Sequence, residues 1–168
     1  MEEQNNKPRI GIARNVARKL LSDIGIQNPP ILIRAIVKYI KKDKDLSVYP
    51  WLFGNSTSGI QITQEDSATI GYNKTQHQHR QRFTVAHEIG HLLLGHTNKN
   101  FISDLNDKKP EEVEANQFAA ELLMPLQMLN NDFKNGLKDA KNIALKYNVS
   151  EEAVWWRLCD CKLINKIQ

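Results

Sequence analysis

The stretch from Phe83 to His96, FTVAHEIGHLLLGH, constrains this chain more than any other segment. It contains His87, Glu88 and His91 in the order H-E-x-x-H. On an α-helix, two residues four positions apart project from the same face, one turn removed. Two imidazoles placed in this way can share one Zn²⁺ ion, and the glutamate beside them can take a proton from its water. The segment therefore predicts a helix with two metal ligands, His87 and His91, and a general base, Glu88.

Length and composition limit the architecture and the location that we expect. With 168 residues, of which 40% are hydrophobic, the chain can bury one core of useful size. Its first ten residues, MEEQNNKPRI, lack the apolar run of a signal peptide, and no apolar run elsewhere reaches the length of a membrane span. Cys159 and Cys161 are too close together for a disulfide framework and match no common zinc pattern, which is typical of reduced thiols. These features predict a cytoplasmic protein with no membrane partner.

The chain before the motif predicts two helices and a small sheet. Apolar residues recur at helical spacing over 9–24, and Asn28-Pro29-Pro30 is typical of the cap and first turn of a second helix, over 31–42. From residue 46 the pattern changes to three short segments rich in β-branched and aromatic residues, LSVYPWLF, SGIQIT and SATIGYN. We expect a three-stranded antiparallel sheet, with Pro50 placing the first strand at an edge or a bulge. If SATIGYN is an edge, an extended substrate can pair along it.

A catalytic zinc ion needs a third protein ligand, and His96 is the first candidate. It follows His87 by nine residues, so on a continuing helix it points to the opposite side. We therefore expect His96 to be a surface histidine at a helix end. Residues 97–110 then form a polar connection.

Two glutamates in the next helix, EEVEANQFAAELLM, are the other candidates. Glu112 extends the apolar stripe of this helix towards its N-terminus, and a carboxylate on the core side must be paired or bind metal. Glu114 is the runner-up, on another side of the helix. We predict Glu112 as the third ligand and a hydrogen bond from Asn116, one turn on, to a ligand histidine. Tyr72, His77 and His79 are candidates for a second donor to the developing oxyanion, and the sequence does not select among them.

The segments FTVAHEIGHLLLGH and EEVEANQFAAELLMP resemble the ImmA/IrrE family of metallopeptidases, sharply over residues 81–125 and more loosely over the sheet. The family shows a similar T-x-A-H-E-[IL]-G-H stretch and a similar E-A-N-x-F-A-x-x-L-L-M-P stretch. The resemblance implies a gluzincin-like α+β fold with one Zn²⁺ ion held by His87, His91 and a glutamate in 112–114. It also implies a bacterial setting, linked to mobile elements and stress responses, in which relatives cleave or antagonise a helix-turn-helix transcriptional repressor.

The C-terminal segment IALKYNVSEEAVWWRLCDCKLI resembles a helix-turn-helix. Its second helix carries Glu151, Glu152 and Asp160, which make a poor surface for phosphates, so we expect a packing or substrate-docking role and no DNA binding. Trp155 and Trp156 are expected in the core or in an interface.

Together these observations predict an α+β fold. Residues 1–125 form a zincin-like metallopeptidase domain with a helical part (1–45), a sheet (46–74) and the active-site helices (80–125), and residues 126–168 form a helical segment. The expected function is zinc-dependent hydrolysis of a peptide bond in a regulatory protein, a helix-turn-helix repressor, which relieves repression. The alternative is a non-proteolytic anti-repressor, or a regulator that binds DNA or the repressor and keeps a zinc site.

Overall fold

The computed structural model describes residues 7–96, 101–103 and 106–164. Parts of two stretches considered above, MEEQNNKPRI and the polar connection 97–110, lie outside these residues, at 1–6, 97–100 and 104–105. The elements are, in chain order, α1 (Ile10–Ile24), α2 (Ile33–Ile40), β1 (Asp45–Trp51), β2 (Gly59–Thr63), β3 (Ser67–Asn73), α3 (Gln78–Leu94), β4 (Phe101–Ser103), α4 (Pro110–Leu123), α5 (Leu126–Lys134), α6 (Ala140–Tyr147) and α7 (Glu151–Asp160).

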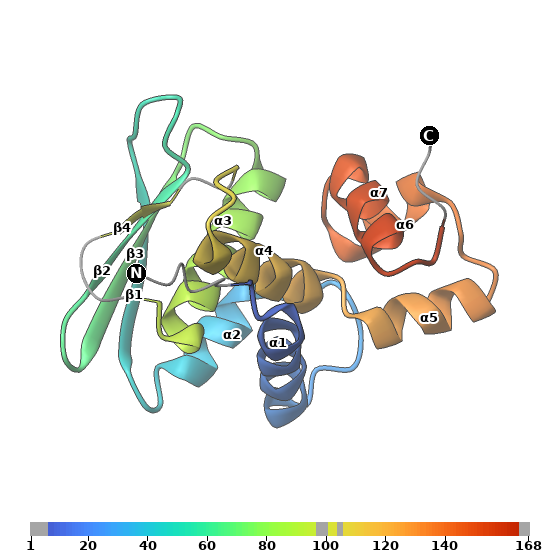
Figure 1. Ribbon diagram of the computed structural model, residues 1–168, viewed down its shortest axis with the longest axis horizontal. Coiled ribbons are helices and arrows are strands. Elements are labelled where there is room, and N and C mark those ends of the chain that lie inside the picture. The colour runs from blue at the N-terminus through green and yellow to red at the C-terminus, as the bar shows by residue number, and fades with distance from the viewer. Residues whose placement is uncertain (1–6, 97–100, 104–105, 165–168) are drawn as a thin grey trace, which may run out of the picture.

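Four strands form one sheet in the order β1-β3-β2-β4 (Figure 1). β2 pairs antiparallel with β3 and β4, whereas β1 pairs with β3 in parallel. The three predicted strands are confirmed, but the purely antiparallel, three-stranded arrangement is wrong. Phe101–Ser103 adds a strand within the polar connection, and β1 runs parallel to its neighbour β3. An alternating pattern marks a strand but does not specify which strand pairs with it.

The order of the strands also corrects the expected substrate edge. β3, the segment SATIGYN, lies between β1 and β2 and pairs with both along its length, so no further strand can add to it. β1 is an edge strand, as Pro50 predicted, because a residue without an N–H is tolerated where no neighbour needs it.

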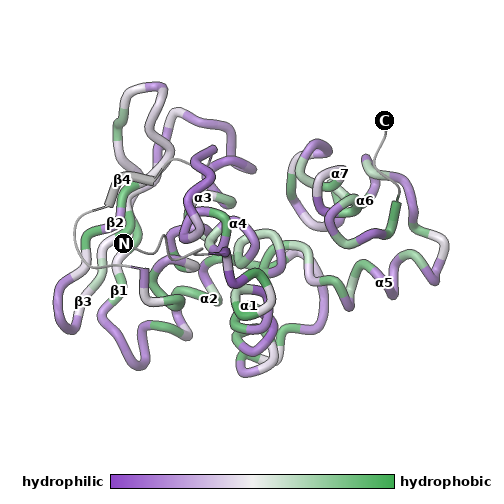
Figure 2. Tube along the Cα trace, viewed as in Figure 1, coloured by the Kyte–Doolittle hydropathy of each residue, from purple (hydrophilic) through white to green (hydrophobic). Residues whose placement is uncertain are grey.

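The helices α1, α3 and α4 pack together beside the sheet (Figure 1). Gly25 and Gly95 terminate α1 and α3 in the left-handed conformation, and Pro110 occupies the first turn of α4, which are typical places for glycine and proline. Figure 2 shows hydrophobic residues along α1 and α2 and hydrophilic residues at the turns between strands. α2 starts at Ile33, later than predicted, because Leu32 before it is still extended.

A buried arginine connects the C-terminal helices to this body. The guanidinium of Arg157 in α7 donates from Nε to the carbonyl oxygen of Met124 (3.0 Å) and pairs with Glu121 of α4. Arg18 of α1 contacts the same carboxylate. Both partners of the α7–α4 pair are almost fully buried, so removal of Glu121 would leave the guanidinium of Arg157 as an uncompensated buried charge.

Trp155 and Trp156 were expected in the core or in an interface. They lie outside the core, so the first of these two positions is wrong. They are 45% and 70% exposed, because α7 buries Val154, Arg157 and Leu158 and leaves the two intervening tryptophans outside the core. The described part of the chain contains no helix with the length and apolar character of a membrane span.

Candidate metal centre

Helix α3 holds the H-E-x-x-H motif in the interior of the molecule. The helix starts after His77, whose ring accepts a hydrogen bond from a backbone N–H of the first turn, and it ends at Gly95. His87 and Glu88 have no exposed surface, and His91 has 1%. Because a buried polar group must find a partner, the groups that these side chains meet decide what the site can bind.

Helix α4 approaches α3 closely at Gly90, where α3 has no side chain. A Cβ atom at this position would lie 2.9 Å from Cδ1 and 3.2 Å from Cβ of Phe118 in α4. Glu112, in the first turn of α4, is 1% exposed and turns towards the histidines of α3. The close approach of the two helices therefore brings a carboxylate to the motif.

Three side chains converge between α3 and α4. Nε2 of His87 lies 2.9 Å from Nε2 of His91 and 3.0 Å from Oε2 of Glu112. Nε2 of His91 lies 3.4 Å from Oε1 of Glu112. Ligand atoms of one tetrahedral zinc ion, each about 2.1 Å from it, are about 3.4 Å apart, close to these separations. The three residues thus form a buried group that could hold a metal ion.

The other ring nitrogens of the two histidines are engaged as well. Nδ1 of His87 lies 2.9 Å from Oδ1 of Asn116, which is the hydrogen bond predicted for Asn116. Because an amide oxygen only accepts, Nδ1 of His87 carries the proton and Nε2 keeps its lone pair. Nδ1 of His91 lies 3.0 Å from Nδ1 of His96. Nitrogen lone pairs and a carboxylate that face one another favour a cation among them, so this donor set fits a divalent metal ion.

The carboxyl group of Glu112 is ionised at neutral pH. Burial by itself would raise its pKa, but the contacts with the rings of His87 and then His91 more than reverse this effect and hold the pKa at about 2. Glu112 can therefore offer an oxygen ligand without first releasing a proton.

Glu88 lies on the side of α3 that faces strand β2. Its Oε1 is 3.0 Å from the point that a Cβ atom on Gly59 would occupy, and Cγ2 of Thr84 is 2.5 Å from the same point. Only a residue without a side chain leaves room for Glu88 here. The strand was predicted from SGIQIT, but the role of its glycine was missed; a glycine in a strand pattern is the available signal of such a close approach.

His96 is not the surface histidine that was expected. The chain turns back after the left-handed Gly95, so the N–H of His96 donates to the carbonyl oxygen of His91 (3.0 Å) and its side chain is 5% exposed. The prediction assumed a continuing helix, which Gly95 ends. Burial lowers the pKa of His96, against the opposing hydrogen bond with Glu114, and so favours the neutral ring.

The remaining candidates do not belong to the group of three donors. The carboxylate of Glu114 contacts Arg9 and His96. His77 caps α3, Nε2 of His79 lies 3.2 Å from Oδ1 of Asn148, and Tyr72 belongs to the central strand β3. A role for any of these groups in oxyanion stabilisation stays untested.

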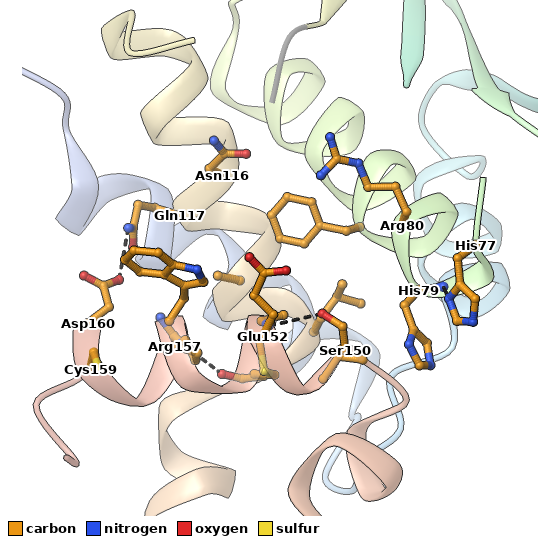
Figure 3. Close-up of a pocket in the computed structure, with 17 residues that line it drawn as sticks. His77, His79, Arg80, Asn116, Gln117, Ser150, Glu152, Arg157, Cys159 and Asp160 are labelled. Atoms are coloured by element: carbon orange, nitrogen blue, oxygen red, sulfur yellow. Dashed lines mark hydrogen bonds between the residues drawn. The ribbon is translucent and has the colours of Figure 1, made fainter. Parts of the chain in front are cut away.

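A cavity of about 780 Å³ opens between α3, α4 and α7 (Figure 3). Arg80 enters it from α3 and Glu152 from α7, while Asn116 lines it from α4. Because Asn116 also bonds His87, the cavity and the metal centre share one wall. The rest of the lining combines polar and apolar side chains. The polar group includes His77, His79, Gln117, Ser150, Arg157 and Asp160, and the apolar group is Phe83, Ala120, Leu123, Met124, Val149, Ala153 and Trp156.

The chain is similar to one protein family and to a phage protein. The chain matches the model of peptidase family M78, described as the IrrE N-terminal-like domain, over residues 42–158. It is 30% identical over 141 residues to "Uncharacterized immunity region protein 2" of Bacillus phage phi105, an alignment that covers 75% of this chain and 89% of the phage protein. 

A solved structure, a Mycobacterium tuberculosis transcriptional regulator, superposes with a TM-score of 0.67 over 89% of this chain. At 13% identity this similarity concerns the fold alone, and the chain spans 46% of that protein. The α+β class that the sequence predicts is thereby confirmed. With the family match extending over the motif helix, the Glu112 helix and most of the C-terminal helices, the chain belongs to peptidase family M78, a metallopeptidase family with an IrrE N-terminal-like domain.

Proposed function

We propose that this chain is a zinc-dependent endopeptidase that hydrolyses a peptide bond in a regulatory protein. The observation that carries the proposal is the buried convergence of His87, His91 and Glu112 in the helix pair that also carries Glu88. Two imidazoles and one carboxylate are a ligand set of catalytic zinc, which keeps a fourth position open. When bound, zinc would lower the pKa of a water molecule and polarise the substrate carbonyl.

The protein groups then perform the proton transfers and hold the ligands. Glu88 takes a proton from the attacking water and delivers it to the leaving amine. Its burial against β2 keeps the carboxylate in one place and away from bulk water. Asn116 holds the ring of His87 with Nε2 directed towards Glu112.

A helix-turn-helix repressor is the substrate class that we propose, in a mobile-element or stress-response setting of bacteria. The resemblance to the ImmA/IrrE family implies it, and the similar phage protein is named for an immunity region. Such a substrate places the protein in the cytoplasm. Direct DNA binding by α7 is disfavoured, because Glu151 and Glu152 in its first turn repel phosphates.

The cavity beside Asn116 is the proposed docking site for an apolar segment of that substrate. It adjoins the metal centre, apolar side chains such as Phe83 and Leu123 line part of it, and Trp156 on its rim is 70% exposed. In this proposal residues 1–125 form the zincin-like catalytic domain, and residues 126–168 supply the docking helices. A large exposed aromatic residue beside a cavity is a typical anchor for a protein partner.

The decisive experiment compares the wild type with Glu88→Gln. Both proteins are assayed for bound zinc and are then incubated with candidate repressors, whose fragments are identified by mass spectrometry. We expect equal zinc content, cleavage by the wild type, and loss of cleavage by about 10²-fold or more in the variant, because the general base is absent. If Glu88→Gln still relieves repression in cells without cleaving the repressor, the protease function is refuted and the non-proteolytic anti-repressor is favoured.

A further inference from the structure

A chain of hydrogen bonds leads from the far side of His91 to the start of α1. Nδ1 of His91 lies 3.0 Å from Nδ1 of His96, and Nε2 of His96 lies 2.9 Å from Oε2 of Glu114. The same carboxylate accepts from Arg9, whose Nη2 is 2.8 Å from Oε2 and whose backbone nitrogen is 2.7 Å from Oε1. The side chains of His96 and Glu114 are 5% and 4% exposed. Few water molecules can therefore replace these contacts.

The direction of each proton follows from the carboxylate at the end of the chain. An ionised carboxylate only accepts hydrogen bonds, so Nε2 of His96 carries the proton that it donates to Glu114. In a neutral imidazole the other nitrogen is then an acceptor, so Nδ1 of His91 donates to Nδ1 of His96. His91 consequently keeps the lone pair of Nε2, which faces His87 and Glu112. This is the tautomer that a metal ion requires.

Arg9 brings a part of the chain outside the family match into this arrangement. The matched residues are 42–158, whereas Arg9 immediately precedes α1. Arg9 contacts Glu114 through Nε, Nη2 and its own backbone N–H, so both carboxylate oxygens are held. With its oxygens engaged in this way, Glu114 is fixed as the acceptor for His96.

We propose that His96 and Glu114 are positioning residues that, with Arg9, hold His91 in the tautomer and orientation that bind the metal. The affinity of the site for zinc then depends on a contact from the start of α1. This inference rests on the proposed function only in requiring a zinc-binding site, and it does not require peptide hydrolysis.

The main alternative is that Arg9–Glu114 only clamps α1 to α4. The chain provides a matched control, because Arg18 and Glu121 form a second α1–α4 ion pair of similar geometry, with Nε 2.9 Å from Oε1. Arg18 is 45% exposed and Arg9 52%, and both carboxylates are buried. Arg18→Gln therefore loosens the same pair of helices without touching His91.

The experiment measures the zinc affinity of the full chain by competition with a chromophoric chelator, and the visible spectrum of the cobalt(II) form. His96→Phe keeps the ring volume and removes both nitrogens, Glu114→Gln removes the charge, and His96→Gln restores one donor and one acceptor. Because loss of a ligand's hydrogen-bond partner costs about 10–100-fold in metal affinity, we expect this range for His96→Phe and about 10-fold for Glu114→Gln. We expect His96→Gln to recover part of the affinity, and Arg18→Gln to change it less than about 2-fold. The cobalt(II) spectrum should shift in His96→Phe.

The outcomes separate this inference from the proposed function. If the wild type binds zinc and His96→Phe binds it equally well, only the positioning role is overturned. If Arg18→Gln weakens zinc as much as Glu114→Gln, with an equal fall in Tm, the clamp alternative replaces it. If His96→Phe abolishes binding as completely as His87→Ala, His96 is a ligand and the inference is wrong. A wild type that binds no zinc overturns the proposed function together with the inference.

Discussion

Replacing Gly90 with alanine tests whether the close packing of α3 on α4 sets the metal centre. The new Cβ atom would lie 2.9 and 3.2 Å from two carbons of Phe118, whereas favourable carbon contacts lie at about 3.5–4.0 Å. The ring of Phe118 is fully buried and has no solvent to move into. The helix that carries the ring must therefore shift, and that helix also carries Glu112.

The sign of the effect follows from two opposing contributions. Alanine in place of glycine inside an open helix stabilises by about 1 kcal/mol. Overpacking of a buried contact costs about 1–3 kcal/mol, so the net change for Gly90→Ala is a destabilisation of up to about 2 kcal/mol. Gly11 in α1 is the matched control, because nothing lies within 4 Å of a Cβ atom built there. We expect Gly11→Ala to raise the free energy of unfolding by at most about 1 kcal/mol.

The assay is urea unfolding of the metal-free proteins, followed by a zinc titration of each. Displacement of Glu112 from the two histidines should weaken zinc binding by about 10-fold in Gly90→Ala, because even the loss of a ligand's hydrogen-bond partner lowers metal affinity by about 10–100-fold. Zinc binding by Gly11→Ala should equal that of the wild type. If Gly90→Ala stabilises the protein as Gly11→Ala does and binds zinc normally, the helix spacing does not set the site and the reasoning fails.

Three further results are expected. Gly59→Ala should lower the rate of peptide hydrolysis by at least about 10-fold, because the new Cβ atom would displace the proposed base Glu88. Gly54→Ala, with open space around its Cβ atom, should keep the wild-type rate, and equal rates in the two variants would contradict the role of Glu88. Trp156→Ala should raise KM by about 10-fold at nearly constant kcat, and the equally exposed Leu145→Ala, outside the cavity, should alter neither; a fall in kcat alone would argue against docking. Glu121→Gln should destabilise the protein by about 3 kcal/mol at neutral pH, because it leaves a buried guanidinium uncompensated. Burial raises the pKa of Glu121, but its contacts with Arg18 and Arg157 more than reverse this and lower the pKa below the unfolded value of 4.5. The stability that the charge of Glu121 contributes is therefore present above pH 4.5 and is lost as the pH falls through the lowered pKa. Unfolding curves at several pH values should show that the destabilisation of Glu121→Gln relative to the wild type shrinks in acid.

The two helices of the metal centre were predictable because their signals are local. The spacing of His87 and His91 and the stop at Gly95 predict α3, and the helix formers between Pro110 and the next proline predict α4. The choice of Glu112 followed from the face of the helix on which it stands. Its position beside the histidines agrees with that choice, while its role as a ligand stays a prediction.

The features that the sequence did not predict depend on the direction of the chain after a helix ends, or on contacts between residues far apart in the sequence. The left-handed turn at Gly95 reverses the direction in which His96 points, and helical spacing beyond a stop carries no information on it. Arg9 meets Glu114 across 105 residues, which no local pattern encodes. The pairing of β1 with β3 was likewise not predictable, because β2 and β3 have the same alternation of apolar and polar residues.

Two glutamates of one helix turn serve different purposes because α4 lies between α3 and α1. Residues two positions apart on a helix point about 200° away from each other, so Glu112 faces the histidines of α3 and Glu114 faces Arg9. Burial raises the pKa of Glu114, but the hydrogen bonds from Arg9 and then His96 reverse this and hold the pKa at about 2, as low as that of Glu112. Both groups are therefore ionised at neutral pH, and charge alone does not distinguish the proposed ligand Glu112 from Glu114. The distinction comes from Arg9, which occupies both oxygens of Glu114 and leaves Glu112 as the carboxylate that faces His91.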